Sequence, residues 1–199
     1  MDRQIRGDWN SKKRALTGYS AGFSAYDQVY GEEQRMKYER CSRHLLGGGE
    51  KTILDCGCGT GMLLERLAGQ SRFLVGVDYS RAMLQLARTR AGVASNVCLV
   101  CADADNLPFE SETFDEVVSF TMLGNMPNID ETIREIARVA RNGAQILLSF
   151  IKKNITTAEV LASLEAACVN VREFVDEESL KDWIAIGRKL PRINFRPTN

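Results

Sequence analysis

Short apolar runs alternate along the chain with segments whose apolar residues recur every three or four positions. Short runs predict strands, and the wider spacing predicts helices that bury one face. Strands are expected at 52–55, 73–77, 97–101, 115–120, 144–151, 169–175 and 181–188. Helices are expected at 32–46, 61–68, 80–90, 130–140 and 156–168. This alternation predicts an α/β fold in which helices cover both faces of a mostly parallel sheet.

Turn and capping residues mark several of the expected boundaries. The three glycines at 47–49 should end the first helix, and Asn142-Gly143 should end the fourth. Ser80 is a suitable N-cap for the third helix. Only residues 176–178 link the last two strands, so these strands should form a hairpin. The expected sheet of seven strands therefore ends in an antiparallel strand.

Length and composition fit one domain. The 199 residues are 44% hydrophobic and 26% charged, and Lys+Arg and Asp+Glu both number 26. This balance gives no global field that would attract nucleic acid or an anionic membrane. The sequence has neither a signal-peptide core nor an apolar run approaching the roughly 20 residues of a membrane span, so we expect a cytoplasmic protein. We divide the chain into an arm and helix at 1–46, an α/β domain at 47–190 and a basic tail at 191–199.

Four of the six cysteines have spacings that a zinc site can use: Cys56 with Cys58, and Cys98 with Cys101. Two features argue against zinc. The first pair lies inside a glycine-rich turn that should face a ligand, and strand geometry points the second pair to different faces. We therefore expect no metal, and free, mostly buried thiols in a reducing compartment.

A glycine-rich turn joins the first expected strand to its helix in the segment KTILDCGCGTGMLLERL. Asp55 closes the strand, and Gly57, Gly59 and Gly61 follow. Glycines let the backbone turn tightly and let a ligand approach it closely. The next strand ends at Asp78, where a carboxylate is placed to accept both hydroxyls of a ribose. The sequence therefore predicts a nucleotide-type ligand at the carboxyl ends of these two strands.

Two ligand classes compete for this turn. A dinucleotide fingerprint, G-x-G-x-x-G, needs its third glycine where the chain has Met62, whereas Gly61 comes one residue early. Asp55 also precedes the first glycine by two positions. The resulting D-x-G-x-G-x-G pattern resembles motif I of class I S-adenosylmethionine (SAM) methyltransferases. Met62 and the closing hairpin disfavour the alternative, an NAD-dependent Rossmann enzyme.

A second segment strengthens the resemblance. Residues 99–109, LVCADADNLPF, are similar to the G-D-A-x-x-L-P-F segment of UbiE-like methyltransferases, with Ala102 where a glycine is common. The resemblance implies the Rossmann-like class I methyltransferase fold, with SAM as cofactor and Asp103 accepting from the adenine amino group. Tyr79 and Met83 match a family segment that flanks ribose and adenine, although core packing explains Met83 equally well.

The segment before the first helix also resembles the family. Tyr26-Asp27 and Tyr30 match a Y-D-x-x-Y pattern that folds over SAM in many relatives, although simple packing of the arm explains it equally well. The resemblance assigns the following residues to the cofactor: Tyr30, Asp55, Gly57, Cys58, Gly59, Gly61, Asp78, Tyr79, Met83, Ala102, Asp103, Ala104, Ser119 and Phe120.

The resemblance implies a SAM-dependent methyltransferase. The methyl group of a sulfonium is already electrophilic, so catalysis needs alignment in a dry pocket, and a base only where the nucleophile loses a proton. Catalytic residues are accordingly unassigned. His44, the only histidine, is a candidate base, although a half-exposed position on a helix explains it better.

The acceptor is expected to be a small molecule, and no membrane partner is expected. The alternatives are an RNA or protein acceptor, a requirement for a partner subunit or a homodimer, and a SAM-binding protein without catalysis. The RNA alternative rests on basic residues at 12–14 and near the C-terminal end of the given sequence: Arg188, Lys189, Arg192 and Arg196.

Overall fold

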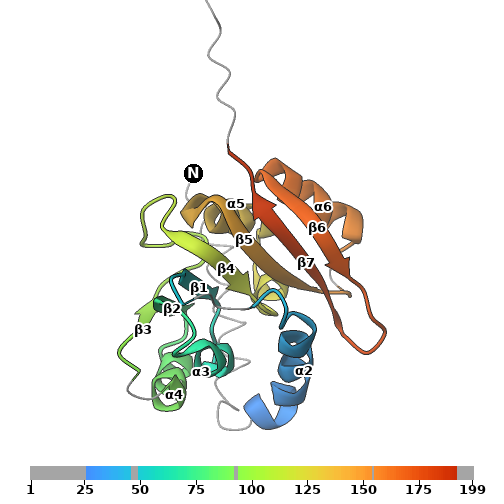
Figure 1. Ribbon diagram of the computed structural model, residues 1–199. Helices are drawn as coiled ribbons and strands as arrows, with labels where there is room; N and C mark the ends of the chain where they lie inside the picture. Colours follow the sequence, from blue (N-terminus) through green and yellow to red (C-terminus); the bar gives the residue numbers. More distant parts are fainter. Residues whose placement is uncertain (1–25, 46–48, 92–93, 154, 192–199) are drawn as a thin grey trace, which may run out of the picture.

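The computed structural model describes residues 26–45, 49–91, 94–153 and 155–191 (Figure 1). The arm before Tyr26, including the basic residues at 12–14, lies outside the described residues, as do Arg192 and Arg196 of the tail.

In the described ranges, seven strands form one sheet in the order β3-β2-β1-β4-β5-β7-β6. The strands are β1 Thr52–Cys56, β2 Phe73–Asp78, β3 Val97–Cys101, β4 Phe114–Ser119, β5 Ala140–Ile151, β6 Val169–Val175 and β7 Asp182–Lys189. The first five run parallel, and β7 runs antiparallel to both of its neighbours, β5 and β6. The predicted mostly parallel sheet with a C-terminal hairpin is therefore confirmed.

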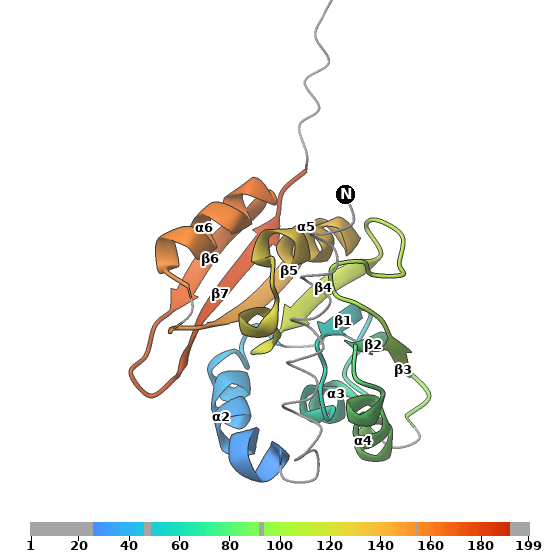
Figure 2. The same cartoon turned by 180° about the vertical axis from the view of Figure 1, so that it is seen from behind.

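Helices cover both faces of the sheet (Figures 1 and 2). They are α2 Tyr26–Arg40, α3 Met62–Leu67, α4 Arg81–Ala91, the short 3-10 helix η2 Met122–Asn125, α5 Ile129–Val139 and α6 Thr157–Ala166. Ile53 packs with residues of α2, α3 and α4, whereas its neighbour Leu54 packs with residues of α5 and α6. Both side chains are fully buried, as expected for a parallel strand covered on two sides.

The first helix differs from its prediction. α2 spans Tyr26–Arg40 rather than 32–46, so it ends before the glycines that were expected to stop it. Its buried residues are Gly31, Gln34, Lys37 and Tyr38, a mostly polar stripe that a search for apolar spacing cannot detect. The helix is therefore held by polar partners on neighbouring elements, which are described below.

The start of β5 also differs. The helix predicted at 130–140 ends at Val139 as expected, but β5 begins at Ala140, four residues before its predicted start at 144. Phe114 of β4 pairs with Ala140, whereas Glu116 pairs with Gln145, so β5 carries extra residues at this point. Gly143 has a φ of +81° there, a conformation that glycine adopts without strain. The remaining element boundaries agree with the predictions to within two residues.

Candidate cofactor site at the carboxyl ends of β1 and β2

The glycine turn after β1 lies at the point where the sheet order reverses, with β2 on one side of β1 and β4 on the other. Ligands of open parallel sheets bind at this position, outside the carboxyl ends of the strands. The amides of Gly57 and Cys58 both donate to the carbonyl of Val77, at 2.8 and 2.9 Å. The turn is thereby fixed to the end of β2.

The three glycines of the turn have different surroundings, although all have positive φ. A Cβ on Gly57 would lie 2.5 Å from the Cβ of Met122, and one on Gly61 would lie 2.9 Å from Ala87. A Cβ on Gly59 would meet nothing within 4 Å. Packing alone therefore explains Gly57 and Gly61, whereas Gly59 faces open space that a ligand can occupy.

Asp78 at the end of β2 connects the glycine turn to α4. Its Oδ2 accepts from the amide of Gly59 at 2.9 Å, and its Oδ1 accepts from the amide of Ser80 at 2.8 Å. Each carboxylate oxygen keeps a further lone pair, so Asp78 can still accept from a ligand hydroxyl. Ser80 Oγ accepts from the amide of Met83 at 3.3 Å, which confirms Ser80 as the cap of α4.

A small cavity of about 30 Å³ lies between α2 and the glycine turn. Its lining residues are Tyr26, Gln34, Tyr38, Asp55, Gly57, Cys58, Gly59, Thr60, Met62 and Phe120. Of these described residues none is a lysine, arginine or histidine, so the cavity walls carry no positive charge. Five of them were assigned to the cofactor from the sequence: Asp55, Gly57, Cys58, Gly59 and Phe120. α2 adds three residues that were not assigned: Tyr26, Gln34 and Tyr38.

The electrostatic environment of the site is negative. Burial, helped by the charge of Asp78, raises the pKa of Asp55 to about 7. Burial also raises the pKa of Asp78, against the lowering effect of its two backbone hydrogen bonds. The pKa of the Cys56 thiol is raised by burial and then by Asp55, Asp78, Asp105 and Asp103, so four carboxylates act on one point. Such a field favours a cationic ligand.

The residues assigned to ribose and adenine lie beside Asp78 rather than in the cavity. The amide of Ala102 donates to the carbonyl of Asp78 at 3.3 Å, and Asp103 Oδ1 accepts from the amide of Asp105 at 3.1 Å. Met83 and Ala104 are buried. The Tyr79 carbonyl accepts from Cys101. The structure thus brings this group to the carboxyl ends of β2 and β3.

Three further assigned residues have distinct positions. Tyr30 is 40% exposed and packs against Tyr26, with ring centroids 4.9 Å apart, so Tyr26 and not Tyr30 lines the cavity. Phe120 lines the cavity and contacts the ring of Tyr38 edge to face at 5.3 Å. Ser119 is fully buried, and its hydroxyl has no hydrogen-bond partner in the described part of the chain.

The first turn of α2 is anchored directly to the glycine turn. Thr60 Oγ1 donates to Asp27 Oδ1 at 2.7 Å, and Arg90 of α4 pairs with the other oxygen of Asp27. Arg90 Nη1 also donates to Thr60 Oγ1 at 2.9 Å. These contacts hold the described part of α2 that precedes the predicted start at residue 32.

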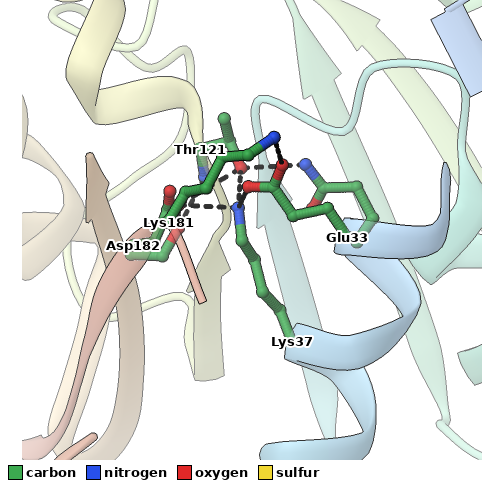
Figure 3. A network of polar contacts seen from close by, with 7 residues as sticks. Glu33, Lys37, Thr121, Lys181 and Asp182 are labelled. Carbon is green, nitrogen blue, oxygen red and sulfur yellow. Dashed lines mark hydrogen bonds and ion pairs between the residues drawn. The ribbon is translucent and has the colours of Figure 1, made fainter. Parts of the chain in front are cut away.

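The middle of α2 meets a buried polar network at the carboxyl ends of β4 and β5 (Figure 3). Lys37 Nζ lies 2.8 Å from Thr121 Oγ1, 2.7 Å from Asp182 Oδ2 and 3.1 Å from Glu33 Oε1. Lys181 pairs with the other oxygen of Glu33 at 2.8 Å. Sequence analysis missed this network because its partners are 84 and 145 positions apart from Lys37 and no local pattern links them.

His44 and the cysteine pair of β3 lie outside the site, whereas Cys58 lines its cavity. His44 contacts Glu173 at 3.1 Å, and its carbonyl accepts from Gln145 near the start of β5, at the opposite end of the sheet. Cys98 and Cys101 are exposed, contrary to the expectation of mostly buried thiols, because β3 is an edge strand. Across the described residues, no cluster of three or more His, Cys, Asp or Glu could hold a metal. None of the helices in those ranges has the length and hydropathy to cross a bilayer.

Comparison with known proteins identifies relatives. A family model described as a methyltransferase domain matches residues 54–148. Demethylmenaquinone methyltransferase of Corynebacterium urealyticum is 36% identical over 118 residues, which are 59% of this chain and 49% of that protein. Malonyl-(acyl-carrier protein) O-methyltransferase of Erwinia pyrifoliae is 30% identical over 185 residues, which are 93% of this chain and 62% of that protein. The chain therefore spans about half to three fifths of the length of these relatives.

A solved structure agrees with the sequence comparison. Magnesium protoporphyrin IX methyltransferase from Synechocystis PCC 6803, determined with bound SAM, has a TM-score of 0.77 over 89% of this chain and 97% of that chain. Its sequence identity is 19%, so this likeness concerns the fold alone.

Proposed function

We propose that residues 54–148, which match the methyltransferase-domain model, form a class I, SAM-dependent methyltransferase domain, and that the protein transfers a methyl group from SAM to a small-molecule acceptor. The observation that carries the proposal is the open face of Gly59 beside a negative, acceptor-lined cavity. SAM combines a sulfonium, an ammonium and one carboxylate, so its net charge is positive. That charge matches the site.

The residues present fit SAM in three places. Asp78 offers two carboxylate oxygens to the ribose hydroxyls, and Asp103 lies next along the sheet for the adenine amino group. Gly59 leaves room for the chain that carries the sulfonium. Asp55 and Gln34 line the same cavity as Gly59.

The same charges argue against the dinucleotide alternative. NAD carries a pyrophosphate, whose negative charges would face Asp55 and Asp78, with Asp103 and Asp105 close behind. None of the described residues that line the cavity supplies a balancing cation. The cost of placing like charges together in a partly buried site supports SAM over NAD.

When SAM is bound, its sulfonium supplies an electrophilic methyl group and a neutral leaving group. The task of the protein is to fix the geometry and exclude water, since the transfer is an in-line displacement. Phe120 and Tyr38 form an apolar wall at the cavity, which the partly buried Met62 of α3 also lines, and the buried Leu63 packs in the same apolar cluster. A base is needed only for acceptors that must lose a proton.

The small-molecule acceptor is supported by the relatives and by charge. One relative is named for demethylmenaquinone, a small molecule, and the other for a malonyl group, a small acyl group carried on a protein. The formal net charge of the chain is +0, which gives no general attraction to RNA.

A labelling experiment tests the proposal. Purified protein is incubated with methyl-labelled SAM and fractionated cell extract, with a Gly59→Val variant as the inactive control. Label in the small-molecule fraction that the variant fails to transfer is the expected result. Label in RNA or protein would show that the acceptor is a macromolecule and not a small molecule. Absence of transfer by a protein that binds SAM would favour a non-catalytic role or a missing partner subunit.

A further inference from the structure

A groove of about 720 Å³ lies between η2, α5 and α6, on the face of the sheet opposite α2. Both views show α5 and α6 next to each other on this face (Figures 1 and 2). In the part of the chain that the structure describes, the groove has no lining residue in common with the cavity beside the glycine turn. Its volume lies in the range of about 300–1,000 Å³ that is typical of small-molecule sites. The groove is therefore a candidate binding site separate from the cofactor site.

The groove has an apolar floor. Met126, Ile129 and Ile155 line it and are partly buried against the larger apolar cluster of the core. Ala162 and Ala166 of α6 also line it, and both are exposed, so their small side chains leave the space between the helices open. A ligand that covered these residues would remove apolar surface from water, which is favourable. The floor therefore selects a largely apolar molecule.

Most polar side chains that line the groove already have partners within the protein. Asn128 caps the first turn of α5, and Glu159 is the capping-box residue of α6. Ser163 donates to Asp130 and so links the two helices. Arg134 differs, because it is exposed and makes no hydrogen bond or ion pair with any described residue. Its guanidinium has five N–H donors and no acceptor. An oxygen atom of a ligand in the groove would therefore be recognised by Arg134.

The charges around the groove disfavour an anionic ligand. Asp130 and Glu159 are carboxylates, and hydrogen bonds from Thr156 lower the pKa of Glu159. Arg134 is the single cation on the described lining. A carboxylate or phosphate bound to Arg134 would share the groove with two like charges, whereas a neutral carbonyl oxygen accepts from Arg134 without that repulsion. A cationic ligand would instead be repelled by Arg134.

We propose that the groove between α5 and α6 binds a neutral, largely apolar small molecule whose carbonyl-type oxygen accepts a hydrogen bond from Arg134. The two sites meet only across η2. Met122, at the start of η2, packs against Gly57 of the cofactor turn, whereas Gly124 and Met126 line the groove. Binding in the groove can therefore be measured without methyl transfer and does not depend on the proposed function.

Fluorescence titration tests the site with two naphthalene dyes of similar size. Prodan is neutral and carries one ketone, whereas anilinonaphthalene sulfonate carries a negative charge. The wild-type protein should bind prodan at least tenfold more tightly than the sulfonate. Ala162→Phe fills the groove and should weaken prodan binding at least tenfold. Ala158→Phe is the matched control, because Ala158 is an exposed alanine of the same helix that does not line the groove, and it should leave prodan binding unchanged.

Arg134 gives a second pair of variants. Arg134→Met removes every donor and should weaken prodan binding at least threefold, whereas Arg134→Lys keeps a charged donor and should retain most of the affinity. Saturating S-adenosylhomocysteine should not displace prodan. The inference would be overturned by absence of prodan binding, by tighter binding of the sulfonate, by unchanged prodan affinity in Ala162→Phe or Arg134→Met, or by displacement with S-adenosylhomocysteine. Failure of the protein to bind S-adenosylhomocysteine would contradict only the proposed function.

Discussion

Lys37 and Asp182 form an ion pair from which solvent is excluded. Nζ and Oδ2 are 2.7 Å apart, and the two side chains are 0% and 1% exposed. Ser149 adds a hydrogen bond to the same oxygen at 2.7 Å. The pair joins α2 to β7 across the carboxyl end of the sheet, and so it holds one wall of the candidate site.

Removing the cation of this pair should be strongly destabilising. Lys37→Met leaves the Asp182 carboxylate buried without its counter-charge, and such a loss typically costs about 3–5 kcal/mol. The measurement is the free energy of unfolding in urea. Lys181→Met is the matched control, because Lys181 also pairs with Glu33 but is 75% exposed, and its loss should be too small to resolve. Equal effects of the two substitutions would contradict the burial argument.

Gly57 and Gly59 of the turn should separate stability from binding. Gly57→Ala places a Cβ 2.5 Å from Met122 and should destabilise the fold by roughly 1–3 kcal/mol from overpacking, in addition to about 1–2 kcal/mol for a left-handed backbone. Gly59→Ala meets no neighbour and should lose only the second amount, yet it should weaken S-adenosylhomocysteine binding at least tenfold. Unchanged binding by folded Gly59→Ala would show that the ligand does not approach this residue.

Asp78 should be sensitive even to a change of one atom. Asp78→Asn keeps one acceptor but sets an NH₂ group against the amide of Gly59 or of Ser80. The turn then loses a charge-assisted hydrogen bond, and the ribose hydroxyls lose their carboxylate partner. The binding free energy of S-adenosylhomocysteine should therefore weaken by roughly 1.5–3 kcal/mol. Isothermal titration calorimetry measures the effect. A dissociation constant equal to that of the wild type would remove Asp78 from the site.

Asp55 should make the stability of the ligand-free protein depend on pH. Its folded-state pKa of about 7 lies above the ordinary 3.8, so the folded protein holds a proton that the unfolded chain has lost. Stability from this group is present at low pH and is lost as pH rises through about 7, by up to about 4 kcal/mol. Asp78, which faces Asp55, has a raised pKa and shifts stability in the same direction.

Asp55→Asn isolates that contribution. Because the amide has no charge to bury, the variant should gain stability relative to the wild type as pH increases from 4 to 8, measured by urea unfolding at each pH. The nearby groups Tyr38, Cys56 and Cys58 have raised pKa values and remain neutral over this range. A stability difference that stays constant with pH would show that Asp55 does not titrate as the burial argument requires.

The sequence revealed those parts of the site that local backbone geometry determines. Gly57, Gly59 and Gly61 all have positive φ, and Ser80 caps α4, so spacing and residue type were sufficient to predict the turn. The fold class followed from the same logic, since apolar runs of strand length alternated with helical spacing.

The position and role of α2 could not be predicted in this way. Asp27 reaches Thr60 and Arg90, and on the buried face of the helix Lys37 reaches Asp182. These partners are distant in the sequence, and a buried lysine contradicts the usual association of burial with apolar residues. A prediction from apolar spacing therefore places the helix too far along the chain, toward the buried Cys41 and Leu45.

The central claim is that the site between α2 and the glycine turn binds SAM rather than a dinucleotide. Calorimetric titration of the wild-type protein with S-adenosylhomocysteine and with NAD, under identical conditions, tests it most directly. The negative field of Asp55 and Asp78 predicts that S-adenosylhomocysteine binds at least tenfold more tightly, a difference of about 1.4 kcal/mol. Tighter binding of NAD, or no binding of S-adenosylhomocysteine, would contradict the account.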